Sequence, residues 1–324
     1  MSVVALLLVL SAAIAHAIWN IVAHGASRSG IPFLWWGSVF ATVLWVGVIP
    51  FTGGFGTGDF AGFTLGILVS AVLHVCYMLV LQRGYARGEL STVYATARGS
   101  GPLLTVCVAI LILGEQPSWL ALSGVGLVLL GVVAFGIIGW RPAIPARLGG
   151  SRAKASEHAA GIGDGRGGED GRTHAKRWSR MIDPAIGYGL LTGAAIAAYT
   201  IWDAYAVNTL SIAPVAFMVG CTAAEIPFFT AALLRRGRTG AAGLGVELRT
   251  NWRRLLVFGI FSPLSYILVL TAVTMAPLSL VAPMREVSVV LVGLYGAWRF
   301  RESRPVLRIL AALVVVAGVL LIGL

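Results

Sequence analysis

Charged residues are scarce in this 324-residue chain, at 11% of the sequence, whereas soluble proteins carry about 25%. The chain is 58% hydrophobic with a mean hydropathy of +0.88, and its apolar residues gather in many runs of about 20 residues, the length that an α-helix needs to cross a bilayer. The scarcity of charge therefore excludes a soluble globular protein and predicts an all-α, polytopic membrane protein.

Cysteine is also rare, since Cys76, Cys107 and Cys221 are the three in the chain and all lie in apolar runs. We interpret them as small core residues and not as disulfides or metal ligands. The sequence likewise lacks a paired-acid metal motif, a nucleophile elbow and a phosphate-binding P-loop. These absences argue against an enzyme and against ATP as a driving force, and we expect neither a cofactor nor a bound metal.

Apolar windows bounded by turn and charge signals predict ten membrane-spanning helices. Five precede and five follow residues 139–183, a segment rich in Gly, Ala, Arg and Ser that lacks hydrophobic periodicity. Such a segment cannot bury enough apolar surface to fold, so we expect a disordered linker. The chain then divides into a five-helix repeat over 1–138, the linker, and a second five-helix repeat over 184–324. The predicted spans are 2–24, 32–51, 61–82, 90–113, 118–138, 184–207, 212–234, 254–275, 278–299 and 306–324.

The first span has to be distinguished from a signal peptide, because AIAHA at residues 13–17 resembles a signal-peptidase site. No Lys or Arg precedes the apolar run, and part of the segment recurs later in the chain. We therefore expect a retained first helix.

The basic residues are distributed unevenly. Of the 24 Lys and Arg residues, 22 fall in or beside the linker and the loops that follow spans 1, 3, 7 and 9. The positive-inside rule then places these loops and the linker in the cytoplasm and both termini outside. We expect a multi-pass protein of the bacterial inner membrane. Its expected partners are the lipid bilayer and a small-molecule substrate, with a homodimer as an open option, and no nucleic acid despite the net charge of +11.

Short motifs recur at corresponding places in the two halves. AHAIWN (15–20) resembles AYTIWD (198–203), and ELSTVYATARG (89–99) resembles PLSLVAPMRE (277–286). Because each half has an odd number of spans, the second must be inverted in the membrane relative to the first. Inverted repeats around a midplane site are a recurring architecture of secondary transporters.

Each half also has a glutamate before its last helix, in ILGE (112–115) and FRE (300–302). Two five-helix repeats with this ending resemble the EamA-like branch of the drug/metabolite transporter superfamily. The motifs HAIWN, FLWW, GYARGELSTVYATARGSGP and LGE of the first half are similar to members associated with phosphonate utilisation. The resemblance covers nearly the whole chain outside the linker. It implies ten helices around a central cavity and transport of small metabolites by alternating access, and it leaves the substrate open.

Arg98 lies inside the fourth span, about eight residues or 12 Å from its start. One interpretation is that a buried carboxylate or backbone carbonyls neutralise it and that it holds helices together. The other is that it binds an anion in a cavity, because guanidinium is always charged and matches carboxylate or phosphonate oxygens with two hydrogen bonds. Gly99, Ser100, Gly101 and Pro102 follow it, and they predict a weakened helix in which Pro102 frees the Arg98 carbonyl.

Arg285 occupies nearly the equivalent place in the second repeat, two residues after Pro283. It would approach a midplane anion from the opposite side of the membrane. On a continuous helix the next residue, Glu286, points about 100° away, so the two side chains should not face the same spot. Glu225, near the middle of the seventh span, is then a candidate ion-pair partner or a carrier of a proton.

Other polar and aromatic residues complete the candidate site. His16 and Tyr199 are equivalent in the two repeats, which favours a shared cavity, although a lone buried histidine is more often a neutral core residue. Asp203 lies near its predicted helix end and should reach the interface. The aromatic residues either line the cavity or form interfacial belts. The predicted substrate-binding residues are Arg98, Arg285, His16, Trp19, Tyr94, Tyr199, Trp202 and Tyr266, and the proton-coupling candidates are Glu225, Glu286, His74 and Asp203.

Three functions stay open at this stage. The first is a secondary active transporter that moves a small anionic or zwitterionic metabolite across the bacterial inner membrane by alternating access. A lateral opening between helices would favour a flippase for a lipid or lipid-linked group. A collapsed core with Arg98 fully paired to a carboxylate would favour a membrane component that does not transport.

Overall fold

The computed structural model describes most of the chain outside the predicted linker. Its described residues are helical apart from loops, turns and one isolated β-bridge between Gly56 and Ile212. Eight helices in this part are long and apolar enough to cross a membrane, and Ile31–Val46 and Trp119–Phe135 are shorter apolar helices. The linker prediction lies outside the described residues from 140 onward. The described residues are 1–23, 30–87, 90–139, 184–235, 237–300 and 305–324.

The helices fall where the apolar windows predict them. In the first repeat they are α1 (Val3–Ala23), α2 (Ile31–Val46), α3 (Phe60–Arg87), α4 (Leu90–Leu111) and α5 (Trp119–Gly139). In the second they are α7 (Pro184–Asn208), α8 (Pro214–Leu234), α9 (Arg238–Val273), α10 (Leu278–Arg285), α11 (Val287–Phe300) and α12 (Pro305–Gly323).

Two predicted boundaries are wrong for identifiable reasons. The second span ends as an α-helix at Val46, because Gly47 follows it and the chain then forms a 3-10 turn over Ile49–Phe51. Conversely, α9 begins well before the predicted start at 254. Its polar first turns pack on α2, where the Trp36 indole N–H donates to the Leu244 carbonyl at 2.9 Å.

The two arginine-bearing spans differ in continuity. The α4 helix runs unbroken across Pro102, so the predicted weak point in that helix is wrong. The ninth span is instead interrupted at Glu286, between α10 and α11. There the Glu286 N–H donates to the Pro283 carbonyl at 3.0 Å, a bond one residue shorter than an α-helical one.

Small residues bring α4 and α7 close together. A Cβ added at Gly193 would lie 2.0 Å from Ser100 Oγ and 3.0 Å from the Gly101 nitrogen, and one at Gly189 would lie 2.6 Å from the Thr96 side chain. Backbones that approach so closely are typical of glycine-mediated crossings in membranes. The small residues after Arg98 therefore serve helix packing, which explains why they do not break α4.

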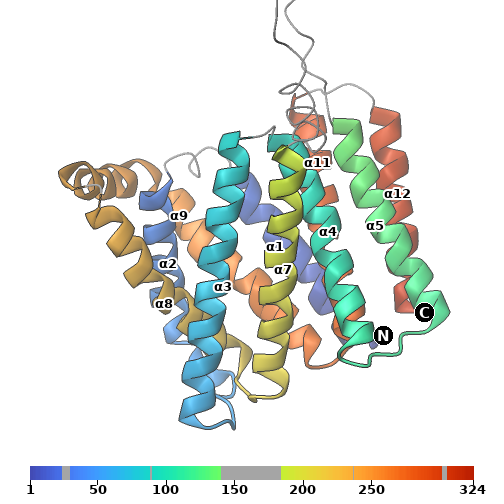
Figure 1. Ribbon diagram of the computed structural model, residues 1–324, viewed down its shortest axis with the longest axis horizontal. Helices are drawn as coiled ribbons and strands as arrows, with labels where there is room; N and C mark the ends of the chain where they lie inside the picture. Colours follow the sequence, from blue (N-terminus) through green and yellow to red (C-terminus); the bar gives the residue numbers. More distant parts are fainter. Residues whose placement is uncertain (24–29, 88–89, 140–183, 236, 301–304) are drawn as a thin grey trace, which may run out of the picture.

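Helix pairing across the repeats is symmetric. The α3 helix packs on α7, and its counterpart α9 packs on α1. Likewise α4 packs on α7, and its counterparts α10 and α11 pack on α1. Two further pairs, α5 with α12 and α2 with α8, each join a helix to its own counterpart. Each contact thus has its counterpart with the repeats exchanged, as expected for two repeats related by a two-fold axis. Figure 1 shows the helices side by side, with both chain ends at one end of the bundle, which we call the termini end.

The repeats are tied together by their loops at the termini end. The α2–α3 loop meets the α7–α8 loop, where the Thr57 N–H donates to the Ser211 carbonyl at 3.1 Å and the Ala213 N–H to the Phe55 carbonyl at 3.4 Å. These backbone bonds join the first repeat to the second.

A glutamate forms the other tie at the termini end. The Glu115 carboxylate, in the loop after α4, accepts the backbone N–H groups of Leu278 at 2.7 Å and Ser279 at 2.9 Å, the first two residues of α10. Pro277, which precedes α10, makes no side-chain cap of its own. The ILGE motif thus caps a helix of the opposite repeat, and its counterpart Glu302 lies outside the described residues.

Candidate binding cavity

A cavity of about 260 Å³ lies among α1, α2, α3, α4, α7, α8, α9 and the end of α10. It extends towards the end of the bundle away from the termini, because α1 and α3 line it with their second halves and Ala23 and Phe33 reach it from that end. We call that side the basic end, since Arg87 and Arg235 are exposed there. A cavity of roughly 150 Å³ already holds benzene, so the space suits a small metabolite.

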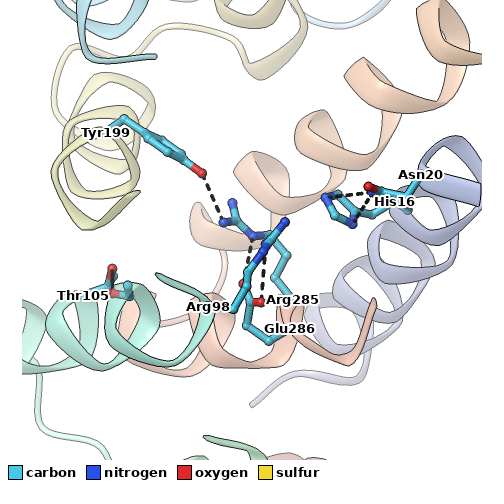
Figure 2. A network of polar contacts seen from close by, with 8 residues as sticks. His16, Asn20, Arg98, Thr105, Tyr199, Arg285 and Glu286 are labelled. Atoms are coloured by element: carbon cyan, nitrogen blue, oxygen red, sulfur yellow. Dashed lines mark hydrogen bonds and ion pairs between the residues drawn. The ribbon is translucent and has the colours of Figure 1, made fainter. Parts of the chain in front are cut away.

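Arg98 and Arg285 line this cavity and share one carboxylate (Figure 2). Arg98 Nη1 lies 3.3 and 3.4 Å from the two oxygens of Glu286, and Arg285 Nε lies 3.9 Å from the nearer one. Arg285 also donates through Nη2 to the Tyr199 hydroxyl at 3.3 Å. Among the described residues no other carboxylate lies within 4.0 Å of either guanidinium. The pair therefore has an excess of one positive charge over its salt-bridge partner.

Two expectations for this group are wrong. Glu286 does not point away from the arginines, because the helix is interrupted at that residue and its carboxylate turns towards Arg98 (Figure 2). Glu225 is not the partner of Arg285; it lies elsewhere along the cavity wall and accepts a hydrogen bond from Ser38 Oγ at 2.9 Å.

Two buried N–H groups on the cavity lining find no acceptor among the described residues, namely Arg285 Nε and Trp19 Nε1. Arg285 is only 8% exposed. Buried polar groups nearly always have a hydrogen-bond partner, and leaving one unsatisfied costs about 1–3 kcal/mol. Donors of this kind beside an excess positive charge are suited to an acidic ligand.

Asp203 belongs to a second polar cluster next to the arginines. It is fully buried, and it accepts hydrogen bonds from Ser70 Oγ at 2.6 Å and from the Tyr266 hydroxyl, with His74 Nε2 at 3.9 Å. The expectation that Asp203 reaches the interface is wrong, because α7 continues past it and α3 and α9 cover it. The His74 ring stacks on Tyr199 with centroids 4.3 Å apart, so the cluster contacts a partner of Arg285.

The structure brings most of the predicted site residues together. Tyr94 and Trp202 are absent from the cavity lining: the Arg98 guanidinium lies 5.3 Å from the centre of the Tyr94 ring, and the Trp202 indole donates to the Gly66 carbonyl at 2.9 Å. Asp203 and Glu286 lie behind the lining. The predicted residues that do line it are Arg98, Arg285, His16, Trp19, Tyr199, Tyr266, Glu225 and His74.

Five polar lining residues were not predicted from the sequence, namely Tyr77, Ser38, Thr222, Ser262 and Ser265. Tyr77 lies three residues after His74 on α3, so helical spacing from His74 would have found it. Ser38 carries no such signal, and its role depends on α8, since it donates to Glu225. Thr222 likewise meets Thr42 of α2 at 2.9 Å.

The fold and the cavity define the class of protein: a polytopic helical membrane protein of two related repeats around a cavity that carries charged side chains, as in secondary transporters. The EamA-like transporter family matches residues 3–137 and 183–324. The chain belongs to this family of membrane transporters of the drug/metabolite type, and the two matched segments coincide with the two repeats.

Further comparisons support the fold and leave the substrate open. Twenty-seven chains of solved structures match. One of them, described only as "Crystal structure of protein", shares 14% identity with a TM-score of 0.63 over 98% of this chain and 95% of that chain. No curated protein matches. The phosphonate association stays a prediction.

Proposed function

We propose that the protein is a secondary active transporter that moves a small anionic or zwitterionic metabolite across the bacterial inner membrane by alternating access. Ten spans, as two inverted five-helix repeats, would surround the cavity. The observation that carries the proposal is the arginine pair, in which Arg98 and Arg285 line the cavity and share the single carboxylate of Glu286.

An acidic substrate would complete the hydrogen bonding of this site. Its oxygens could accept from Arg285 Nε and Trp19 Nε1, the two lining donors without an acceptor in the described part of the chain. Hydrogen bonds from guanidinium to carboxylate or phosphonate are charge-assisted and stronger than neutral ones. A second glutamate beside the arginine pair would neutralise its excess positive charge permanently. Because the described residues place no second glutamate there, the acid group of a substrate can bind to the pair and be released again.

The test is solute flux and binding with purified protein in liposomes. Arg98→Ala should abolish uptake of acidic solutes, and Arg98→Lys should weaken their binding about tenfold, since lysine keeps the charge and loses the fork. Arg253→Lys, an exposed position on α9 outside the cavity, is the matched control. Absence of flux for any acid would contradict the transport proposal, and full flux in Arg98→Ala would contradict the site.

The proposed orientation places the basic end in the cytoplasm and the termini outside, following the positive-inside rule. Single cysteines introduced next to Met1 and next to Arg235 would report it. An impermeant maleimide applied to sealed spheroplasts should label the cysteine next to Met1 and not the one next to Arg235. The reverse pattern would contradict the orientation.

A lipid or lipid-linked-group flippase is the second candidate, and one observation favours it. A groove of about 290 Å³ between α2, α3 and α8 adjoins the cavity and shares Leu34, Met78 and Phe229 with it, while Leu79 and Phe228 on the groove are exposed. Scrambling of dye-labelled phospholipid in the same liposomes would support this candidate. Flux of soluble acids without lipid movement would support the first.

A non-transporting membrane component has less support. Arg98 does meet a carboxylate, but its hydrogen bonds to Glu286 are long and the core around it is hollow and not collapsed.

A further inference from the structure

Glu225 is a second charged group on the cavity wall. It lies on α8, is 9% exposed, and lines the cavity together with the residue that binds it, Ser38. Ser38 Oγ donates to one carboxylate oxygen, Oε2, at 2.9 Å. No other side-chain or backbone donor to Glu225 is found in the described residues, so its second oxygen is available to the cavity.

Glu225 forms no ion pair with any described residue. In the described part of the chain no Lys, Arg or His nitrogen lies within 4.0 Å of its carboxylate. The two arginines of the cavity are associated with Glu286 and Tyr199 instead. A carboxylate held in the interior without a counter-charge costs several kcal/mol, so the site favours a ligand that brings a positive charge to it.

Two regions of opposite charge therefore line the same cavity. One is the arginine pair with its excess positive charge, and the other is the isolated carboxylate of Glu225. An ammonium group at Glu225 would also lie among aromatic lining residues such as Phe229, whose faces attract cations.

We propose that the substrate is a small zwitterion whose acid group binds at Arg98 and Arg285 and whose ammonium group binds at Glu225. This inference rests on the proposed transport function and narrows its substrate class. A dianion would bring a second negative group to Glu225, and a diamine would bring a second positive group to the arginine pair. Both are disfavoured by like-charge repulsion, which gives specificity through unfavourable contacts as well as favourable ones.

Matched ligand pairs test the proposal on the full-length protein in detergent. The dissociation constants of 2-aminoethylphosphonate and ethylphosphonate are compared, and likewise those of β-alanine and propionate. In the wild type we expect each amine-bearing acid to bind at least about tenfold more tightly than its partner, a difference of about 1.4 kcal/mol. In Glu225→Gln that advantage should vanish while the affinity for the amine-free acids stays the same.

The matched control is Glu247→Gln. Glu247 is a buried glutamate of α9 that accepts a hydrogen bond from Asn251 at 2.9 Å and does not line the cavity. This variant should keep the amine advantage.

Each other outcome contradicts a defined part of the argument. Equal binding of the two members of each pair in the wild type overturns the ammonium site and needs no variant to fold. Equal weakening of both members in Glu225→Gln, with loss of the pH dependence of uptake by the same variant in liposomes, would make Glu225 a proton carrier and overturn the ammonium site. Binding of neither acid in the wild type contradicts the proposed function itself, and the inference falls with it.

Discussion

The Glu115 carboxylate allows a quantitative prediction about the contact between the repeats. It accepts the N–H groups of Leu278 and Ser279, and these two residues are 3% and 0% exposed. In the intact protein the carboxylate therefore takes the place of solvent at these two N–H groups. The perturbations are Glu115→Ala, which deletes both acceptors and the charge, and Glu115→Gln, which keeps one oxygen and loses the charge.

The magnitude follows from the two contributions of the carboxylate. A helix N-cap contributes about 0.5–2 kcal/mol, and a negative charge at a helix N-terminus adds about 0.3–1 kcal/mol. We expect Glu115→Ala to lower the free energy of unfolding by about 1–3 kcal/mol. Glu115→Gln should cost about half of that, since one hydrogen bond is kept.

Thermal unfolding of the purified variants in detergent, followed by circular dichroism, measures the effect as a lowered melting temperature. The control is Asp59→Asn, because Asp59 Oδ1 accepts the Gly62 N–H at 3.0 Å at the exposed start of α3, where asparagine caps as well as aspartate. A melting temperature of Glu115→Ala equal to that of the wild type would refute the reasoning. So would an equal loss in Asp59→Asn, which would show that any lost carboxylate has the same effect.

Further predictions concern helix packing and the buried aspartate. Gly193→Ala should destabilise the fold by about 1–3 kcal/mol, because its Cβ would overlap Ser100 Oγ. By contrast, Gly187→Ala, which meets nothing within 4 Å on the same helix, should be neutral or stabilising by up to about 1 kcal/mol; equal effects in melting experiments would contradict the packing argument. Asp203→Asn should lower the melting temperature, because the two carboxylate oxygens accept from Ser70 and Tyr266 separately. The substitution replaces one of these oxygens by an NH₂ group, which cannot accept, and so one hydroxyl loses its acceptor at a cost of about 1–3 kcal/mol. An unchanged melting temperature would show that neither bond matters.

The helices could be predicted from the sequence because crossing a bilayer sets the length of each apolar run. The position of the helix interruption could not. Gly99, Ser100, Gly101 and Pro102 predict it in α4, whereas packing against α7 keeps that helix continuous and the interruption falls at Glu286. Local propensity was overridden there by a contact with another helix.

The cavity residues could be predicted in part, because charged and aromatic side chains inside apolar runs are few. Their partners could not, since the pairings join residues far apart in the chain. Glu286 meets Arg98 across 188 residues, and Glu225 meets Ser38 across 187. Helical spacing relates residues within one helix only, so it gave the wrong partner for Arg285.

In the proposed alternating-access cycle, the contacts at the termini end would make the two access states unequal in energy. Opening that end would break the two hydrogen bonds of Glu115 and the two backbone bonds between the α2–α3 and α7–α8 loops, at about 1 kcal/mol each. The empty transporter should therefore rest with its cavity facing the basic end. Passage through the open-termini conformer would then be the slow step of the cycle, and loosening Glu115 would speed turnover even while it lowers stability.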